Sequence, residues 1–424
     1  MTGMTTAVAT PELALPAGYW IRERKTGAVL VALGLLASIW FTLASPSDPA
    51  TFYLGTSTQA GAHFEIAGKV GSLVFGLLAL AAGAALLLTG KRFGLLAGAS
   101  LAFFVSSALV WQVSTVHGAV PLGSLSSITM EASLPLIFGA LAGVLCERSG
   151  VVNVAIEGQL LTGAFFAALF GTIVGSYWAA LGAAAVGGAL ISLILAWLAI
   201  RFLVDQVVVG IVLNTFALGL TGFFYEQVMR SDTEAYNNPG NLPQLAIPGL
   251  SKIPIIGPAI FSGTLLTYAA LALVVVVTIA LFRTRWGLRT RAVGEHPAAA
   301  DTVGIRVLGL RYANVLAAGL IAGLGGAYFS MVTATSFTKN ITGGLGFIAL
   351  AAMIFGRWNP VGAFLAAIFF GFAKALSSLL QALGSPIPSD FLAMLPYIAT
   401  IFAVAGLVGR VRAPAADGKP YVKG

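Results

Sequence analysis

The sequence predicts an all-α polytopic membrane protein with about twelve transmembrane helices, and its composition supports this fold class. Hydrophobic residues make up 58% of the 424 residues, charged residues only 9%, and glycine contributes 51. The mean hydropathy is +0.94. Soluble domains carry roughly 25% charged residues, and a helix of about 20 apolar residues spans a bilayer. The composition therefore excludes an ordinary soluble domain.

Apolar segments divide the chain into four parts. We expect a cytoplasmic N-terminal tail (1–27), an N-terminal extension of about three transmembrane helices (28–120), a transmembrane domain of about nine to ten spans (121–412) and a cytoplasmic C-terminal tail (413–424). The expected spans are 28–44, 70–89, 94–113, 124–147, 156–175, 178–200, 206–225, 265–282, 308–332, 343–355, 360–382 and 391–408. Because 343–355 is too short to cross, we expect it to be broken or tilted with its neighbours.

The basic residues predict the orientation, because cytoplasmic loops carry an excess of lysine and arginine. With both termini in the cytoplasm, 18 of the 23 basic residues fall inside. The exceptions are Lys69, Arg230, Lys252 and Lys339 outside, and Lys374 within a span. The basic residues of the chain are scattered at the ends of spans. The formal net charge of +8 therefore does not indicate a nucleic-acid partner.

The most charged stretch, RTRWGLRTRAVGEHPAAADTVGIRVLGLR (283–311), lies between two long apolar runs. Its arginines predict a cytoplasmic loop. Pro297 at a first helical position and Gly304 at a closing position predict a short helix between them. Its small side chains suit close docking into a groove of a soluble partner. From the residues alone, an ordinary basic loop that binds nothing is equally compatible with the pattern.

Polar residues inside the predicted spans are candidates for a substrate pathway, because such groups are expensive in lipid. Asn153 and Glu157 lie between Gly150 and Gly158, where the helix is expected to unwind, and Asn214 lies in the middle of a span. Glu157 is also compatible with a role at a helix N-terminus. Asn214 is equally compatible with a hydrogen bond between helices.

Enzyme motifs are missing from the sequence. It has no GxxxxGK[ST] phosphate loop, no GxSxG and no HExxH. Its single cysteine, Cys146, forms no disulfide within the chain, and its three histidines do not have metal-ligand spacing. We therefore expect a transport subunit without catalytic residues, metal or cofactor.

Four stretches of the sequence resemble ABC importer permeases of the nucleoside and simple-sugar type, which are associated with basic membrane proteins or are similar to ribose permeases. They are ERSGVVNVAIEGQLLTGAF from Glu147, IPGLSKIPIIGP from Ile247, GEHPAAADTVGI from Gly294 and GLGFIALAAMIFGRWNPVGAFLAA from Gly344. The resemblance covers about residues 131–410 in the family's order and leaves the first 120 or so uncovered. It implies that 121–412 adopts an ABC permease fold and that the first part is an extension.

The resemblance also implies a role for the charged loop and a set of partners. The loop would be the coupling helix that docks on an ATPase, through Glu295, His296, Pro297, Ala298, Ala299, Ala300, Asp301 and Gly304. The implied partners are an ABC ATPase subunit with two nucleotide-binding domains, a second homologous permease and a lipid-anchored solute-binding protein.

The resemblance therefore predicts a multi-pass permease subunit of a bacterial ABC importer in the cytoplasmic membrane. Its path would carry nucleosides or related simple sugars, driven by ATP hydrolysis on a separate subunit. The alternatives are a ribose-type sugar or branched-chain amino-acid permease and, from another class, an ion-coupled secondary carrier. Acidic residues that cluster at span ends weigh against the carrier.

Overall fold

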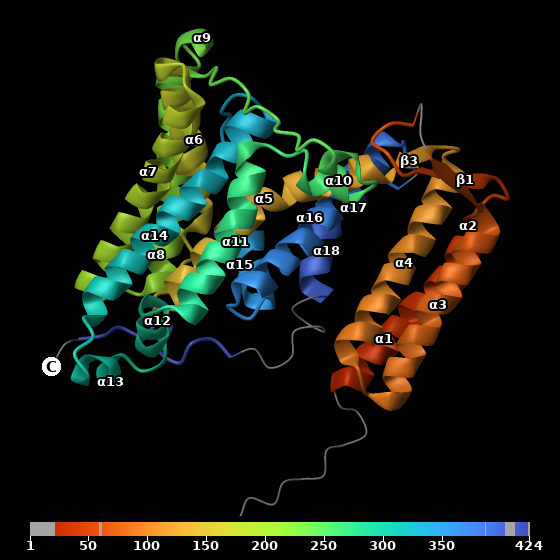
Figure 1. Cartoon of the computed structure of the whole chain (residues 1–424), viewed down its shortest axis with the longest axis horizontal. Coiled ribbons are helices and arrows are strands. Elements are labelled where there is room, and N and C mark those ends of the chain that lie inside the picture. The colour runs from red at the N-terminus through yellow and green to blue at the C-terminus, as the bar shows by residue number, and fades with distance from the viewer. Residues whose placement is uncertain (1–21, 59–61, 386, 403–411, 423–424) are drawn as a thin grey trace, which may run out of the picture. The chain divides into compact units, whose positions relative to one another are not determined.

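A computed structural model describes residues 22–58, 62–385, 387–402 and 412–422 (Figure 1). Within these residues, ten helices are long and apolar enough to cross a membrane, which confirms the predicted all-α polytopic class. An eleventh apolar helix, α15 (Leu345–Phe355), has only 11 residues, as the short segment 343–355 led us to expect. The last expected span, 391–408, lies partly outside the described residues.

The chain divides into two compact units, one formed by residues 1–50 and 66–117 and the other by 51–65 and 118–424. The helices of unit 1 are α1 (Arg22–Leu36), α2 (Thr42–Ala44), α3 (Gly68–Thr89) and α4 (Phe93–Thr115). Glycines let α1 and α3 touch: a Cβ on Gly27 would lie 2.5 Å from the Leu87 backbone nitrogen. Phe41 stacks on Trp111 of α4 at 4.8 Å between ring centroids. Unit 1 is therefore a tightly packed bundle of apolar helices.

A small sheet interrupts the helical pattern. Its strands are β1 (Pro49–Tyr53), β2 (His63–Ala67) and β3 (Ala119–Pro121), in the order β2-β1-β3. β1 runs parallel to β3, with Phe52 opposite Val120. The sheet was not predicted from the sequence, because strands this short show no clear alternation of polar and apolar residues.

Unit 2 holds the remaining helices. They are α5 (Leu122–Glu147), α6 (Ile156–Val174), α7 (Tyr177–Ala196), α8 (Gln206–Phe224), α9 (Thr233–Tyr236), α10 (Ile256–Ile260), α11 (Leu265–Arg283), α12 (Arg285–Glu295), α13 (Pro297–Thr302), α14 (Val307–Tyr328), α15, α16 (Pro360–Ala382), α17 (Ser389–Ala393) and α18 (Leu395–Phe402). π-helical turns extend α7, α8 and α14 to Arg201, Met229 and Thr333. α5 is the central helix, because 83% of its apolar stretch is buried.

Small residues bring α14 close to α6 and α7. A Cβ on Gly188 would lie 2.6 Å from the Gly323 Cα, and one on Gly163 would lie 2.7 Å from the same atom. Such contacts are common between membrane helices, because van der Waals packing replaces the hydrophobic effect there. Gly182, in contrast, faces open space.

The long loop after α8 lies at the end of unit 2 opposite α12 and α13 (Figure 1). Asn237 fixes it by exchanging two hydrogen bonds with the Phe337 backbone, at 2.9 and 2.7 Å. Leu242 N–H donates to the Met331 carbonyl at 3.0 Å. The long loop is therefore held in place by hydrogen bonds to the segment after α14.

Candidate functional site

The first candidate site is α13, the short helix predicted from the GEHPAAADTVGI stretch. His296 caps its N-terminus, because the Nδ1 atom accepts the Ala299 N–H at 3.3 Å. Pro297 occupies the first position, and Gly304 follows the helix with a φ of +84°. This left-handed conformation favours glycine. The helix therefore begins and ends where the sequence predicts.

α13 has an exposed face and a buried face. The side chains of Ala298 and Ala299 are exposed, and Val303 just beyond the helix is 75% exposed. Ala300, in contrast, is buried with Val293 and Val307. Ala298, Ala299 and Val303 are thus free to meet a partner, whereas Ala300 holds the helix to its own unit.

Two acidic residues of the predicted coupling set contact the end of the described chain. The Glu295 carboxylate accepts the Ala415 N–H at 3.2 Å. Asp301 forms a hydrogen bond with the Tyr421 hydroxyl. These carboxylates therefore bind residues 412–422, which we call the C-terminal segment.

α12 precedes α13 in the chain and contacts the residues at the end of α5. Gly294 lies so close to the Arg148 carbonyl that a Cβ would clash with it. Arg148 Nε donates to the Trp358 carbonyl at 2.8 Å. The Arg148 and Arg291 guanidiniums lie over the Phe282 ring, at 5.9 and 5.1 Å from its centroid. Because α12 contacts the residues at the end of α5, a displacement of α12 would push on them directly.

The second candidate site is the break between α5 and α6, where residues 148–155 are not helical. Gln206 accepts the Val152 N–H at 2.7 Å. Asn214 of α8 donates to the Val154 carbonyl at 2.9 Å and accepts the Gly158 N–H at 2.8 Å. Unwound backbone at membrane depth requires such partners, because lipid offers none. Asn214 therefore joins α8 to the break and to α6 by hydrogen bonds, which is one of its two predicted roles.

Glu157 binds the start of α15. Its Oε1 accepts from the Thr342 hydroxyl at 2.6 Å and the Gly344 N–H at 2.8 Å, and its Oε2 accepts the Gly346 N–H at 2.6 Å. A carboxylate at a helix N-terminus satisfies unpaired N–H groups and the helix dipole. Glu157 thus lies in the first turn of α6 and also caps a second helix.

A buried polar chain continues from the break. The Asn153 amide exchanges hydrogen bonds with Gln159, and Gln159 donates to Ser192 at 2.8 Å. Trp358 Nε1 donates to the Glu147 carboxylate at 2.5 Å. The Trp358 side chain is only 6% exposed. Asn153, Glu157 and Asn214 all have protein partners, and their role in a substrate pathway stays a prediction.

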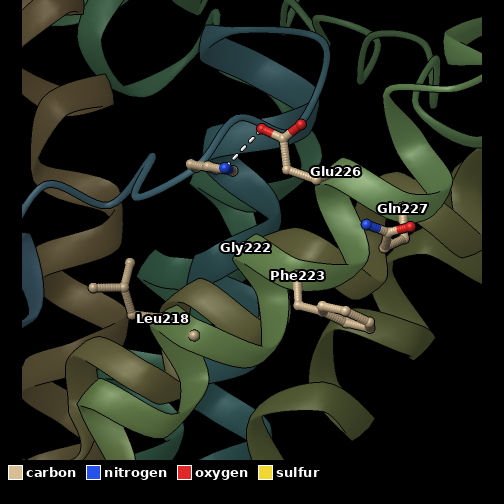
Figure 2. Close-up of a pocket in the computed structure, with 7 residues that line it drawn as sticks. Leu218, Gly222, Phe223, Glu226 and Gln227 are labelled. Carbon is tan, nitrogen blue, oxygen red and sulfur yellow. Dashed lines mark ion pairs between the residues drawn. The ribbon is translucent and has the colours of Figure 1, made fainter.

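A hollow on α8 was not predicted from the sequence. Figure 2 shows Leu218, Gly222, Phe223, Glu226 and Gln227 around it, and Gly219 and Lys339 complete its lining. The Glu226 carboxylate pairs with Lys339 at 2.6 Å and Arg230 at 2.8 Å. The two glycines have nothing within 4 Å of an added Cβ. The surface is therefore open, with an ion pair at one end.

Comparisons with known proteins agree on the family. Residues 125–405 match the family described as "Branched-chain amino acid transport system / permease component". The chain is 45% identical to the guanosine ABC transporter permease protein NupQ of Bacillus subtilis, over 70% of this chain and 95% of that protein. It is 40% identical to the nucleoside ABC transporter permease protein NupC of Lactococcus lactis, over 69% and 94%.

A third relative, the putative glucose ABC transporter permease protein TsgC13 of Haloferax volcanii, is 32% identical over 61% of this chain and 78% of that protein. No solved structure matches the chain. The matched region and the ten apolar helices agree with a transport subunit, not an enzyme. The chain therefore belongs to this family of multi-pass ABC importer permeases, whose members work with an ATPase and a solute-binding protein.

Proposed function

We propose that this chain forms part of the translocation path of a bacterial nucleoside importer. The observation that carries the proposal is the identity of 45% and 40% to permeases named for guanosine and nucleosides, which exceeds the 32% to a permease named for glucose. A second, homologous permease would form the other half of the path.

The basic residues support a cytoplasmic position for one end of the unit. Arg283, Arg285, Arg289 and Arg291 lie at or beside α12, so this end would lie in the cytoplasm, as both termini would. The opposite end, with the loop from α8 to α11, would then receive solute from a lipid-anchored binding protein.

Coupling to the ATPase would use α13. Its exposed Ala298, Ala299 and Val303 form a small apolar surface outside the spans. Alanines let another backbone approach closely and lose little entropy on docking. Motion of the ATPase would then pass through α12 to the end of α5, where Gly294 touches Arg148.

The solute path would follow α8. Asn214, Leu218 and Gly222 recur every four residues and therefore lie along one side of the helix. This side connects the hollow at one end with the break at the other, where Asn153 and Glu157 lie. Gly219 and Gly222 have no side chain and no close neighbour on this side, so they leave room beside the helix for a solute.

The test is uptake by the reconstituted importer with its ATPase and binding protein. We expect ATP-dependent uptake of guanosine that other nucleosides inhibit and glucose does not. Inhibition by glucose or ribose, without inhibition by nucleosides, would instead support the sugar permease alternative. Uptake that an ion gradient drives without ATP would contradict the importer.

A further inference from the structure

The C-terminal segment folds against α12 and α13 (Figure 1). Ala416 N–H donates to the Gly294 carbonyl at 2.9 Å, next to the Ala415–Glu295 hydrogen bond. Ala416 is only 4% exposed, and its carbonyl lies close to Gly150 of the break. The segment therefore contacts α12 on one side and the α5–α6 break on the other.

Tyr421 attaches the far end of this segment to α13. Its ring packs on the small cluster of Val293, Ala300 and Val307, and its hydroxyl bonds Asp301. α13 has only six residues, too few to be a stable helix without tertiary contacts. The C-terminal segment supplies part of those contacts.

Arg311 of α14 links the segment to the membrane-spanning helices. It is 2% exposed, and it donates from Nε to the Ser149 carbonyl at 3.2 Å and from Nη1 to the Lys419 carbonyl at 3.1 Å. A Cβ on Gly150 would lie 2.7 Å from its Nη2 atom, so a larger residue there would displace the guanidinium. One buried cation thus joins α14, the break and the C-terminal segment.

An acidic side chain of the C-terminal segment favours the charge of this cation. It belongs to Asp417, which also forms a hydrogen bond with Glu147. Burial raises the pKa of Asp417 to about 6. A buried charge that loses its partners is strongly destabilising. Removal of the segment would therefore leave Arg311 without the Lys419 carbonyl and without Asp417.

We propose that the C-terminal segment is a clasp that positions the coupling helix α13 on the transmembrane helices, so that displacement of α13 moves α12, the break and α14 together. This inference rests on the proposed coupling role of α13. In its absence, α13 would still present Ala299 to the ATPase, but displacement of α13 would no longer move the break and α14 with it.

The test compares two identical changes, Ala416→Asp at the buried contact and Ala413→Asp at an exposed position of the same segment. Each variant is reconstituted as a complete importer. For Ala416→Asp we expect normal membrane abundance, normal co-purification of the ATPase and near-normal basal ATP hydrolysis. Stimulation of hydrolysis by loaded binding protein, and uptake, should fall about tenfold or more. Ala413→Asp should behave like the wild type.

A second pair covers the case in which Ala416→Asp fails to accumulate. Tyr421→Ala removes the contact with α13, and Val422→Ala is its control, because Val422 is 68% exposed. We expect reduced stimulation and uptake only for Tyr421→Ala. Wild-type stimulation and uptake in Ala416→Asp, or in Tyr421→Ala, would overturn the clasp.

The same assays separate this inference from the function on which it rests. If Ala299→Asp abolishes uptake while Ala416→Asp transports normally, the coupling role stands and the clasp is rejected. If both variants transport normally, the coupling role of α13 is rejected as well.

Discussion

The two units bury different kinds of polar side chain. Among the described residues, unit 1 buries only uncharged ones, namely Ser45, Ser72, Ser100, Ser107, Gln112 and Ser114. Several of these serines donate to helix carbonyls, as Ser107 does to Ser72 at 2.8 Å. Unit 2 buries Glu147, Glu157 and Arg311, together with a broken helix and a half-length one.

The difference supports a transport role for unit 2. Ionisable groups inside a membrane protein are expensive and typically functional, whereas serine hydroxyls join helices at little cost. The family match, residues 125–405, falls within unit 2. We therefore infer that unit 2 transports, and that the extension is accessory to it.

Glu157→Leu should have the largest effect, because three donors at the start of α15 would lose their acceptor. Each buried donor without a partner costs about 1–3 kcal/mol, so we expect a loss of about 3 kcal/mol or more in unfolding free energy. Thermal unfolding in detergent measures it. Glu234→Leu, at an exposed glutamate, is the control and should unfold like the wild type.

A smaller effect, on transport alone, is expected for Gly222→Leu. Neither Gly222 of α8 nor Gly182 of α7 has any atom within 4 Å of an added Cβ, so both tolerate a side chain sterically. If the hollow lies on the solute path, Gly222→Leu should reduce the uptake rate several-fold and Gly182→Leu should not. Equal rates for both variants would show that the hollow faces lipid.

The pH dependence of the C-terminal segment should be modest. The pKa of Asp417 is about 6 when docked and ordinary, about 4, when released. The docked state thus binds more protons between these values, so docking is strongest below about pH 4 and weakens as the pH rises through 6. Glu147 and Arg311 face the same carboxyl and shape this titration.

A nitroxide label at Val422→Cys, with Cys146→Ala, reports docking. We expect a larger mobile fraction at pH 7.5 than at pH 4.5, and a smaller pH dependence after Asp417→Asn, which mimics the protonated acid. A mobile fraction that grows as the pH falls would contradict this sign.

Removal of the extension should have the smallest effect on transport. A chain that begins near Pro121 lacks unit 1 and the small sheet, including residues 51–65 of unit 2, but keeps every helix from α5 onward. We expect assembly with the ATPase and measurable nucleoside uptake. Normal membrane abundance with no uptake would show that unit 1 takes part in the mechanism.

The sequence allowed prediction of features that depend on local pattern. Apolar length located the spans, Pro297 and Gly304 located α13, and Gly150 with Gly158 located the break. Features that depend on distant pairing were not predicted. The partners of Glu157 lie about 185 residues later, and Arg311 meets Lys419 at a separation of 108 residues. Periodicity carries no information about such pairs.

Burial of charged residues near span ends was missed for a related reason. Glu147 and Arg311 were expected to be ordinary charges at the ends of spans, because each lies at or near the end of a predicted apolar span. The C-terminal segment, which covers them, is short and polar and predicts no structure of its own. Likewise, nothing in the alanine run distinguished exposed Ala299 from buried Ala300.

The most direct test of the central claim is therefore uptake by the Ala299→Asp variant, with the ATPase and the binding protein present. A charge on the exposed face of α13 leaves the fold of unit 2 intact but opposes docking on the ATPase. We predict normal membrane abundance, with uptake and stimulated ATP hydrolysis both lost. Wild-type uptake by Ala299→Asp would contradict the coupling role of α13.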